Sequence, residues 1–173
     1  MLNLKTIAKI IGALLGLEAL LMSVCLCVSL LYQDKDIIAF IWSILITIVA
    51  GGAFRLMGRH ANNTISRRDA YFVVAVTWII FSLFGTLPFL ISGHITSFTN
   101  AFFETMSGFT TTGATIVDFP EHFPKGLLFW RSLTQWIGGL GIVFFTIAIL
   151  PSLVGGSLKV FAAEATGPIK SKL

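Results

Sequence analysis

The chain has 173 residues, of which 55% are hydrophobic and only 12% are charged. A soluble domain carries about twice that charged fraction, so the composition excludes an ordinary soluble enzyme and indicates an integral membrane protein. The net charge of +4 does not indicate a nucleic-acid partner. The basic residues lie in the polar stretches between apolar runs, as the rules of membrane topology predict.

Four apolar segments are long enough to cross a bilayer, at about residues 7–31, 37–54, 70–91 and 127–150. Only Gln33 to Asp36 separate the first two segments, which predicts an antiparallel helical hairpin. Pro88 lies near the far end of the third segment, where a proline kinks or ends a helix. The sequence predicts an all-α membrane protein with a two-helix hairpin, residues 1–58. One helix–pore loop–helix repeat follows, residues 59–155, and then a cytoplasmic linker, residues 156–173.

The basic residues are distributed unequally between the two sides of these four segments. Nine fall on one side and three on the other, and the side with more lysine and arginine faces the cytoplasm. Both termini are therefore expected in the cytoplasm, and the stretch after the third segment is expected to enter from outside. The nine are Lys5, Lys9, Arg55, Arg59, Arg67, Arg68, Lys159, Lys170 and Lys172, and the three are Lys35, Lys125 and Arg131.

Glu18 is the only charged residue inside the first apolar segment. A carboxylate at membrane depth is a candidate functional group, because it is costly to keep there. The alternative is that Glu18 faces another helix and is protonated or hydrogen-bonded there.

The stretch from Ala101 to Val117 lies between the third and fourth segments and is too short to span a bilayer. Residues 98–107 are predicted to form a short pore helix, and residues 109–114 an irregular return. Irregular backbone at membrane depth is tolerated where it is buried in protein or lines a water-filled path. Selectivity filters use such backbone to present carbonyl oxygens to a cation.

Several residues of this return suit an ion path. Gly113 can adopt the left-handed dihedrals that aligned carbonyls require, and the hydroxyls of Thr110, Thr111 and Thr112 can bind an ion or brace the loop. The negative end of the short helix would favour a cation. The alternative is a polar re-entrant turn that binds no ion.

Three polar residues flank the return and are candidates to support it: Glu104 in the short helix, and Arg131 and Gln135 near the start of the last segment. Glu104 is expected to brace the loop through hydrogen bonds or an ion pair, with Arg131 or loop amides as its partner. The alternative is that Arg131 extends to the interface and Glu104 lies exposed in a vestibule. Thr115, just past the return, is expected to matter less than Gly113.

Two motifs, FFETMSGFTTTGAT at residues 102–115 and FWRSLTQWIGGLGI at residues 129–142, resemble the first pore repeat of the Trk/Ktr/HKT superfamily of potassium transporters. The resemblance covers essentially the whole chain, including the N-terminal hairpin that TrkH-type members carry. It implies four such repeats around one potassium-channel-like pore, each giving one wall of the filter. Here Thr111, Thr112, Gly113 and Ala114 would form that wall.

The resemblance also implies a function. The chain would take part in potassium uptake across the bacterial cytoplasmic membrane, channel-like or as a symporter, with potassium as substrate at Thr111, Thr112 and Gly113 and no covalently bound cofactor. Some plant relatives with serine at the key glycine prefer sodium, so Gly113 favours potassium. Implied partners are membrane lipid, a second copy in a homodimer, and a cytoplasmic nucleotide-binding regulatory subunit of the TrkA type.

The chain departs from this family in containing one repeat where the family has four. Either it is a piece of a longer transporter, which we favour, or several copies assemble into a pore. A further alternative is a membrane adaptor that does not conduct. An enzyme is not expected, because no apolar segment contains histidine and Ser107 lacks the glycine-rich setting of an intramembrane serine protease.

Overall fold

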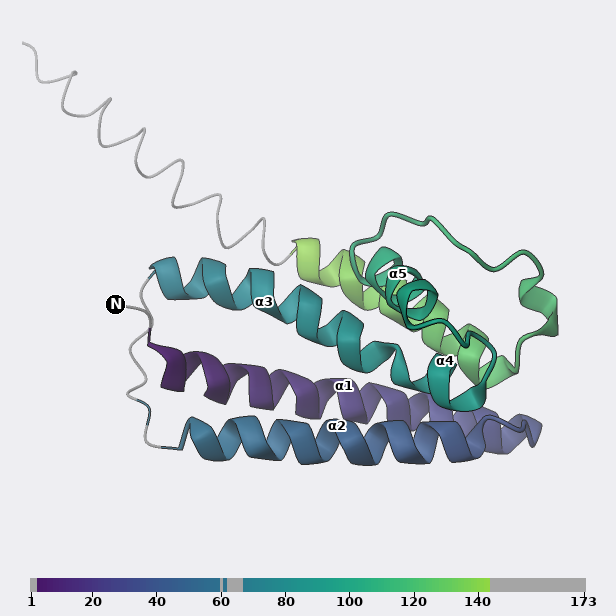
Figure 1. The fold of residues 1–173 in the computed structure, drawn as a ribbon, viewed down its shortest axis with the longest axis horizontal. Helices are drawn as coiled ribbons and strands as arrows, with labels where there is room; N and C mark the ends of the chain where they lie inside the picture. Colours follow the sequence, from purple (N-terminus) through teal and green to yellow (C-terminus); the bar gives the residue numbers. More distant parts are fainter. Residues whose placement is uncertain (1–2, 60, 62–66, 144–173) are drawn as a thin grey trace, which may run out of the picture. The chain divides into compact units, whose positions relative to one another are not determined.

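A computed structural model describes residues 3–59, 61 and 67–143 of the chain, and these residues form only helices and loops (Figure 1). The chain divides into two compact units, residues 1–138 and 139–173. In the second unit, residues 139–143 are helical, and the predicted linker of residues 156–173 lies outside the described residues.

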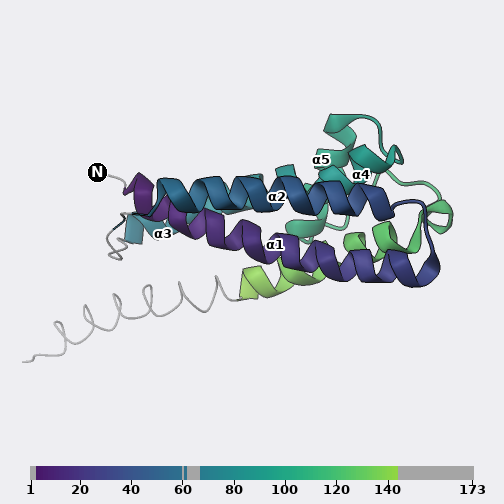
Figure 2. The same cartoon turned by 90° about the horizontal axis from the view of Figure 1, so that it is seen from below.

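The first two helices form the predicted hairpin. Helix α1, Leu4–Tyr32, is capped by Asn3, whose side chain accepts a hydrogen bond from the Thr6 amide at 3.4 Å. It ends at Gln33, which has a left-handed φ of 53°. Helix α2, Ile37–Met57, begins directly after Asp36. Figures 1 and 2 show α1 and α2 side by side.

The third apolar segment is divided into two helices near Pro88. Helix α3, Arg67–Gly85, is followed by helix α4, Leu87–Ser92, which has Pro88 in its first turn. The Thr86 carbonyl accepts hydrogen bonds from the amides of Phe89 and Leu90, both at 3.1 Å. Proline has no amide hydrogen to continue the preceding helix, and it fits the first turn of a new one.

Helix α5, Phe98–Phe109, is the predicted pore helix and extends two residues beyond its predicted end. Figure 1 shows α5 nearly end-on, and Figure 2 confirms that it runs across the direction of α1, α2 and α3. An irregular stretch follows, with a 3₁₀ turn, Pro120–His122. A last helix begins at residue 125 and is described to residue 143, so residues 144–150 of the fourth predicted segment lie outside the described residues.

Three helical segments of the described residues are long and apolar enough to cross a membrane: Leu4–Tyr32, Ile37–Met57 and Arg68–Ser92. They pack against each other through small residues as well as large ones. A Cβ atom at Gly12 of α1 would lie 2.6 Å from the Gly51 carbonyl oxygen of α2, so glycine is needed for the two backbones to approach this closely.

One core joins the hairpin to the helices that follow it. It contains Met22 of α1, Phe40 of α2, Phe89 of α4 and Phe109 of α5, together with Trp130. The buried Trp130 indole donates a hydrogen bond to the Gly85 carbonyl at 3.0 Å. The hairpin and the pore helix therefore pack around the same group of side chains.

The turn of the hairpin contacts the start of the last helix. The Lys125 amide donates a hydrogen bond to Asp34 Oδ2 at 2.6 Å, and the Leu127 amide donates one to Asp36 Oδ2 at 3.1 Å. These amides belong to a first helical turn, which has no partner of its own within the helix. Two carboxylates 91 residues away in the sequence therefore cap this helix.

Candidate functional site

The C-terminal end of α5 lies close against the helix that begins at residue 125. A Cβ atom at Gly108 would lie 2.5 Å from Thr134 Oγ1, and one at Gly138 would overlap the Phe109 carbonyl group. On the other side, Thr105 packs against Gly85 of α3. Small residues on three helices thus allow close packing around the C-terminal end of α5. This packing fixes the position at which the following loop begins.

The backbone of the loop after α5 twice adopts the left-handed region. Gly113 has φ of 75° and Thr111 has φ of 57°. Glycine adopts this conformation at little cost, but for a β-branched residue such as threonine it is a genuine outlier. A strained dihedral of this kind is kept only where the surrounding contacts enforce it, and such residues cluster at functional sites.

Hydrogen bonds from the end of α5 enforce this conformation. The amides of Thr111 and Thr112 donate to the carbonyls of Gly108 and Ser107, at 2.9 and 3.0 Å. The Ser107 hydroxyl reaches forward and donates to the Ala114 carbonyl at 2.6 Å. The loop is therefore tied to the last turn of α5 at both ends of the Thr111–Ala114 stretch.

Glu104 of α5 braces the segment that follows the loop. It is 6% exposed and accepts hydrogen bonds from the Thr115 hydroxyl, at 2.9 and 3.0 Å to its two oxygens, and from the Ile116 amide at 3.0 Å. Arg131 Nε donates to Glu104 Oε1 at 2.7 Å. These hydrogen bonds and the ion pair satisfy a carboxylate that would otherwise be costly to bury at this depth.

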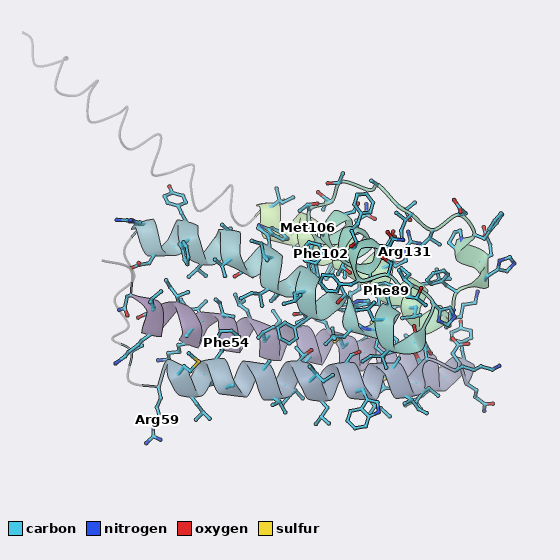
Figure 3. The ribbon with its side chains drawn as sticks, viewed as in Figure 1. Phe54, Arg59, Phe89, Phe102, Met106 and Arg131 are labelled. Carbon is cyan, nitrogen blue, oxygen red and sulfur yellow. The ribbon has the colours of Figure 1, made fainter. Side chains whose placement is uncertain are left out.

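Arg131 connects the last helix to Glu104 and to Thr115, the residue just after the loop. Besides its ion pair with Glu104, it donates from its terminal nitrogen to Thr115 Oγ1 at 3.1 Å. The Val117 amide donates to the same hydroxyl at 3.0 Å. Figure 3 shows Arg131 close to α5. We call Glu104, Thr115 and Arg131 the bracing network.

A small cavity lies behind the loop, between α5 and the last helix. Its volume is about 130 Å³, and its lining includes Glu104, Ser107, Gly113, Arg131 and Gln135. A Cβ atom built on Gly113 would meet Gln135 Nε2 at 3.8 Å and nothing else within 4 Å. The space around Gly113 would thus accept a side chain, and its positive φ is what favours glycine.

The structure brings the residues selected from the sequence to one place. Thr110, Thr111, Thr112, Gly113 and Ala114 form the loop, while Glu104, Arg131 and Gln135 lie behind it or beside it. Thr111 is half-buried, and the other four residues of the loop are exposed. Sequence reasoning missed the hydrogen bonds of the Ser107 and Thr115 hydroxyls and the strained Thr111. That a change of Thr115 affects selectivity less than a change of Gly113 stays a prediction.

Glu18 lies apart from this site. It is completely buried, and neither carboxylate oxygen has a hydrogen-bond partner in the described part of the chain. Its Oε1 is 3.4 Å from the position of a Cβ atom on Gly85. Glu18 therefore faces α3, as the second sequence interpretation expected, but without the hydrogen bond that this interpretation allowed for.

These observations define a class of protein. The chain is an all-helical membrane protein in which a short helix leads into an irregular, braced loop between two longer helices, an arrangement that proteins use for re-entrant segments in membranes. Residues 36–173 match the TrkH family, described as cation transport proteins. The chain belongs to this family, as the two sequence motifs predicted.

Curated relatives cover nearly the whole chain. It is 39% identical over 173 residues to the Trk system potassium uptake protein TrkH of Halomonas elongata, which includes 99% of this chain and 36% of that protein. It is 31% identical over 169 residues to TrkG of Escherichia coli, with 97% and 35% covered. The chain thus spans about a third of the length of the curated relatives it matches.

A solved structure has the same fold. The crystal structure of the potassium transporter TrkH from Vibrio parahaemolyticus matches with a TM-score of 0.79 and 36% sequence identity, over 85% of this chain and 32% of that one. The predicted fold, an N-terminal hairpin followed by one helix–pore loop–helix repeat, is thereby confirmed. The boundaries proposed at residues 58 and 155 stay predictions.

Proposed function

We propose that this chain takes part in potassium uptake across the bacterial cytoplasmic membrane and that Thr110 to Ala114 form one of four walls of its selectivity filter. Potassium is the transported substrate, and it would contact Thr111, Thr112 and Gly113. The relatives whose names specify potassium uptake support this proposal, as does the match to a potassium transporter of known structure.

The observation that carries the proposal is the backbone of residues 110–114. Two positive φ values within three residues turn successive peptide groups in a way that helix and strand do not allow. Because filters bind cations through backbone carbonyls, such a backbone suits an ion path. The bracing network supports this backbone from behind, with Glu104 and Arg131 in contact. Gln135, which is outside the network, lies close to Gly113.

One wall supplies only part of an ion's ligands. The exposed outer face of residues 112–114 suits contact with three further walls, from the same full-length chain or from other copies. The distribution of lysine and arginine supports a multi-pass topology with both termini in the cytoplasm. By resemblance, the complete transporter would be a homodimer with a nucleotide-binding regulatory subunit of the TrkA type.

Substitution of Gly113 tests the proposal. Gly113→Ser, in a full-length protein carrying this sequence, should lower the preference for potassium over sodium without preventing membrane insertion. A Cβ at positive φ costs about 1 kcal/mol or more, and the loop can relax by turning a carbonyl away from the ion. Potassium uptake, sodium uptake and rubidium uptake are measured in cells that lack their own potassium-uptake systems.

Gly93 provides a matched control. It also has φ of 75°, its Cβ position is also open, and it lies at the end of α4, outside the loop. Gly93→Ser should therefore carry the same backbone strain but leave the potassium-to-sodium ratio unchanged. If both variants have the wild-type ratio at normal expression, residues 110–114 do not form a filter wall.

A further inference from the structure

A second candidate site lies at the opposite end of the hairpin from its turn. There, where α1 begins and α2 ends, a cavity of about 440 Å³ is lined by Lys9, Gly52, Arg55, Leu56 and Arg59. Three of these five residues are cations and the other two are apolar. None of them belongs to the loop after α5 or to the bracing network.

Close packing of glycines brings these cations together from two helices. A Cβ atom at Gly12 would lie 2.7 Å from the Arg55 amide nitrogen, and one at Gly58 would lie 2.6 Å from the Lys9 amide nitrogen. The backbones of α1 and α2 therefore approach each other closely at this end. Lys9 of α1 consequently shares one cavity with Arg55 of α2, although like charges repel.

The charge of this cavity is of one sign. Among the described residues, no acidic side chain lines it, and Arg55 and Arg59 form no ion pair there. Guanidinium groups offer several donors in a planar fork that matches the oxygens of a phosphate. The chemistry of the cavity thus suits a phosphate group or another oxyanion.

The surroundings of the cavity match the surface of a bilayer. Both α1 and α2 can cross a membrane, so their ends lie at the level of the lipid headgroups. Figure 3 shows Arg59 beyond the last turn of α2, extending away from the bundle. The neighbouring Leu56 and Met57 are 70% and 69% exposed, which places apolar surface for an acyl chain beside the cations.

We propose that this cavity binds the phosphate of an anionic phospholipid, with Lys9, Arg55 and Arg59 around the phosphate and Leu56 against the acyl chain. Basic pockets between transmembrane helices bind lipid headgroups of this kind. A phosphate free in solution would gain the charge contacts but not the apolar ones. The lipid would join α1 and α2 at the end where the hairpin has no covalent turn. This site does not depend on the filter assignment.

The test uses the full protein carrying this sequence, purified and placed in nanodiscs of phosphatidylcholine with increasing phosphatidylglycerol. Phosphatidylglycerol should raise the melting temperature with a saturable dependence, and native mass spectrometry should detect retained phosphatidylglycerol. Arg55→Gln should shift the half-maximal phosphatidylglycerol fraction about fivefold upward, because each cation near an anionic surface contributes a factor of about that size. Arg55→Gln with Arg59→Gln should shift it further.

Arg68→Gln is the matched control for charge. Arg68 is an exposed cation at the first residue of the third span, and it does not line the cavity. It should leave the phosphatidylglycerol dependence unchanged. An equal shift in Arg68→Gln and Arg55→Gln would mean that only general surface charge is at work, and would overturn the proposal. So would a wild-type protein that does not distinguish phosphatidylglycerol from phosphatidylcholine.

A second variant tests the cavity without changing any charge. A Cβ atom on Gly52 would meet no atom within 4 Å, so Gly52→Leu fits the folded hairpin and fills the cavity. It should weaken the phosphatidylglycerol effect as Arg55→Gln does, and an unchanged effect would contradict the proposal. Soluble glycerol phosphate should not raise the melting temperature. If it does so as well as phosphatidylglycerol, the site binds free phosphate and the lipid assignment is wrong.

Discussion

Thr115 holds the bracing network together through a single hydroxyl group. This hydroxyl donates to Glu104 and accepts from Arg131 and from the Val117 amide. Valine has nearly the same shape and none of these hydrogen bonds. The importance of Thr115 therefore lies in its chemistry and not in its volume.

Thr115→Val is expected to lower the free energy of unfolding by about 0.5–1.5 kcal/mol, the net contribution of an ordinary hydrogen bond, because Thr115 is exposed and the buried Glu104 keeps its bonds from the Ile116 amide and Arg131. It should also lower the potassium-to-sodium uptake ratio. The loop then keeps its hydrogen bonds to the last turn of α5 but loses those of the Thr115 hydroxyl to Glu104 and Arg131. Thr115→Ser keeps the hydroxyl and should behave like the wild type. Melting temperature and ion uptake, measured on the same preparations, would show whether this is so. Equal results for valine and serine would exclude the proposed role of the hydroxyl.

Glu18 presents the opposite case, a polar group without partners. Its carboxylate is completely buried, and neither oxygen is hydrogen-bonded within the described residues. Replacing such a group with an apolar side chain of similar volume is often neutral or stabilising. Glu18→Met should therefore keep or raise the melting temperature, with uptake unchanged.

Glu18→Ala serves for comparison, because it leaves a cavity and should cost about 2 kcal/mol or more. Comparison of the two variants separates the effect of lost side-chain volume from the effect of the lost carboxyl group. Loss of uptake in a well-expressed Glu18→Met protein would show that the carboxyl group itself has a function, as the sequence first suggested.

At the scale of elements, the hairpin turn and the last helix are coupled through Asp36. Burial raises the pKa of Asp36, and the charge of Asp34 raises it further, while a hydrogen bond from Ser29 opposes the shift. A carboxyl group with a raised pKa in the folded state favours folding when it is protonated. This contribution is complete below the ordinary aspartate pKa of about 4 and is lost as the pH rises through the raised value.

Asp36→Asn removes this titration but keeps an oxygen that can accept the Leu127 amide hydrogen. The variant should gain stability relative to the wild type as the pH rises from about 4, and its melting temperature should vary less with pH. Asp36→Ala removes the acceptor as well and should melt at a lower temperature at every pH. A constant difference between Asp36→Asn and the wild type would show that Asp36 does not titrate in this range.

The elements themselves could largely be predicted from the sequence. The two long apolar runs and the Gln33–Asp36 turn indicated the hairpin. A short helix at residues 98–107, unable to span a bilayer, was expected between two longer ones, and α5 covers it and two further residues. Gly113 was expected to need positive φ because glycine alone adopts it cheaply, and its φ is 75°.

Other features required the folded chain. Nothing near Thr111 in the sequence indicates a left-handed threonine, since the hydrogen bonds that enforce it come from the preceding helix turn. Asp34 and Asp36 look like ordinary acids in a polar turn, and their partners lie 91 residues further along. Local sequence patterns cannot identify contacts between residues so far apart. Glu104 and Arg131 are different, because charged residues in apolar surroundings are expected to pair with each other.

For the whole molecule, the topology is the prediction that can be tested most directly. The unequal distribution of basic residues predicts a cytoplasmic loop at residues 55–69 and external loops at residues 33–36 and 118–125. Single cysteines are introduced at Asn62, which lies outside the described residues, and at Glu121, after Cys25 and Cys27 are replaced. A membrane-impermeant thiol reagent applied to intact cells should label Glu121→Cys and not Asn62→Cys. The reverse labelling pattern would invert the topology.

The contacts of Asp34 and Asp36 join two parts of the chain that are synthesised at different times. A ribosome adds about 5–20 residues per second, so the hairpin turn is made roughly 5–20 seconds before the amides of Lys125 and Leu127 that it caps. During that interval the two carboxylates stand at the membrane surface with their future partners not yet synthesised. The last helix, in contrast, meets a finished acceptor as soon as its first turn forms. The end of the pore repeat is thus synthesised after the carboxylates that cap it.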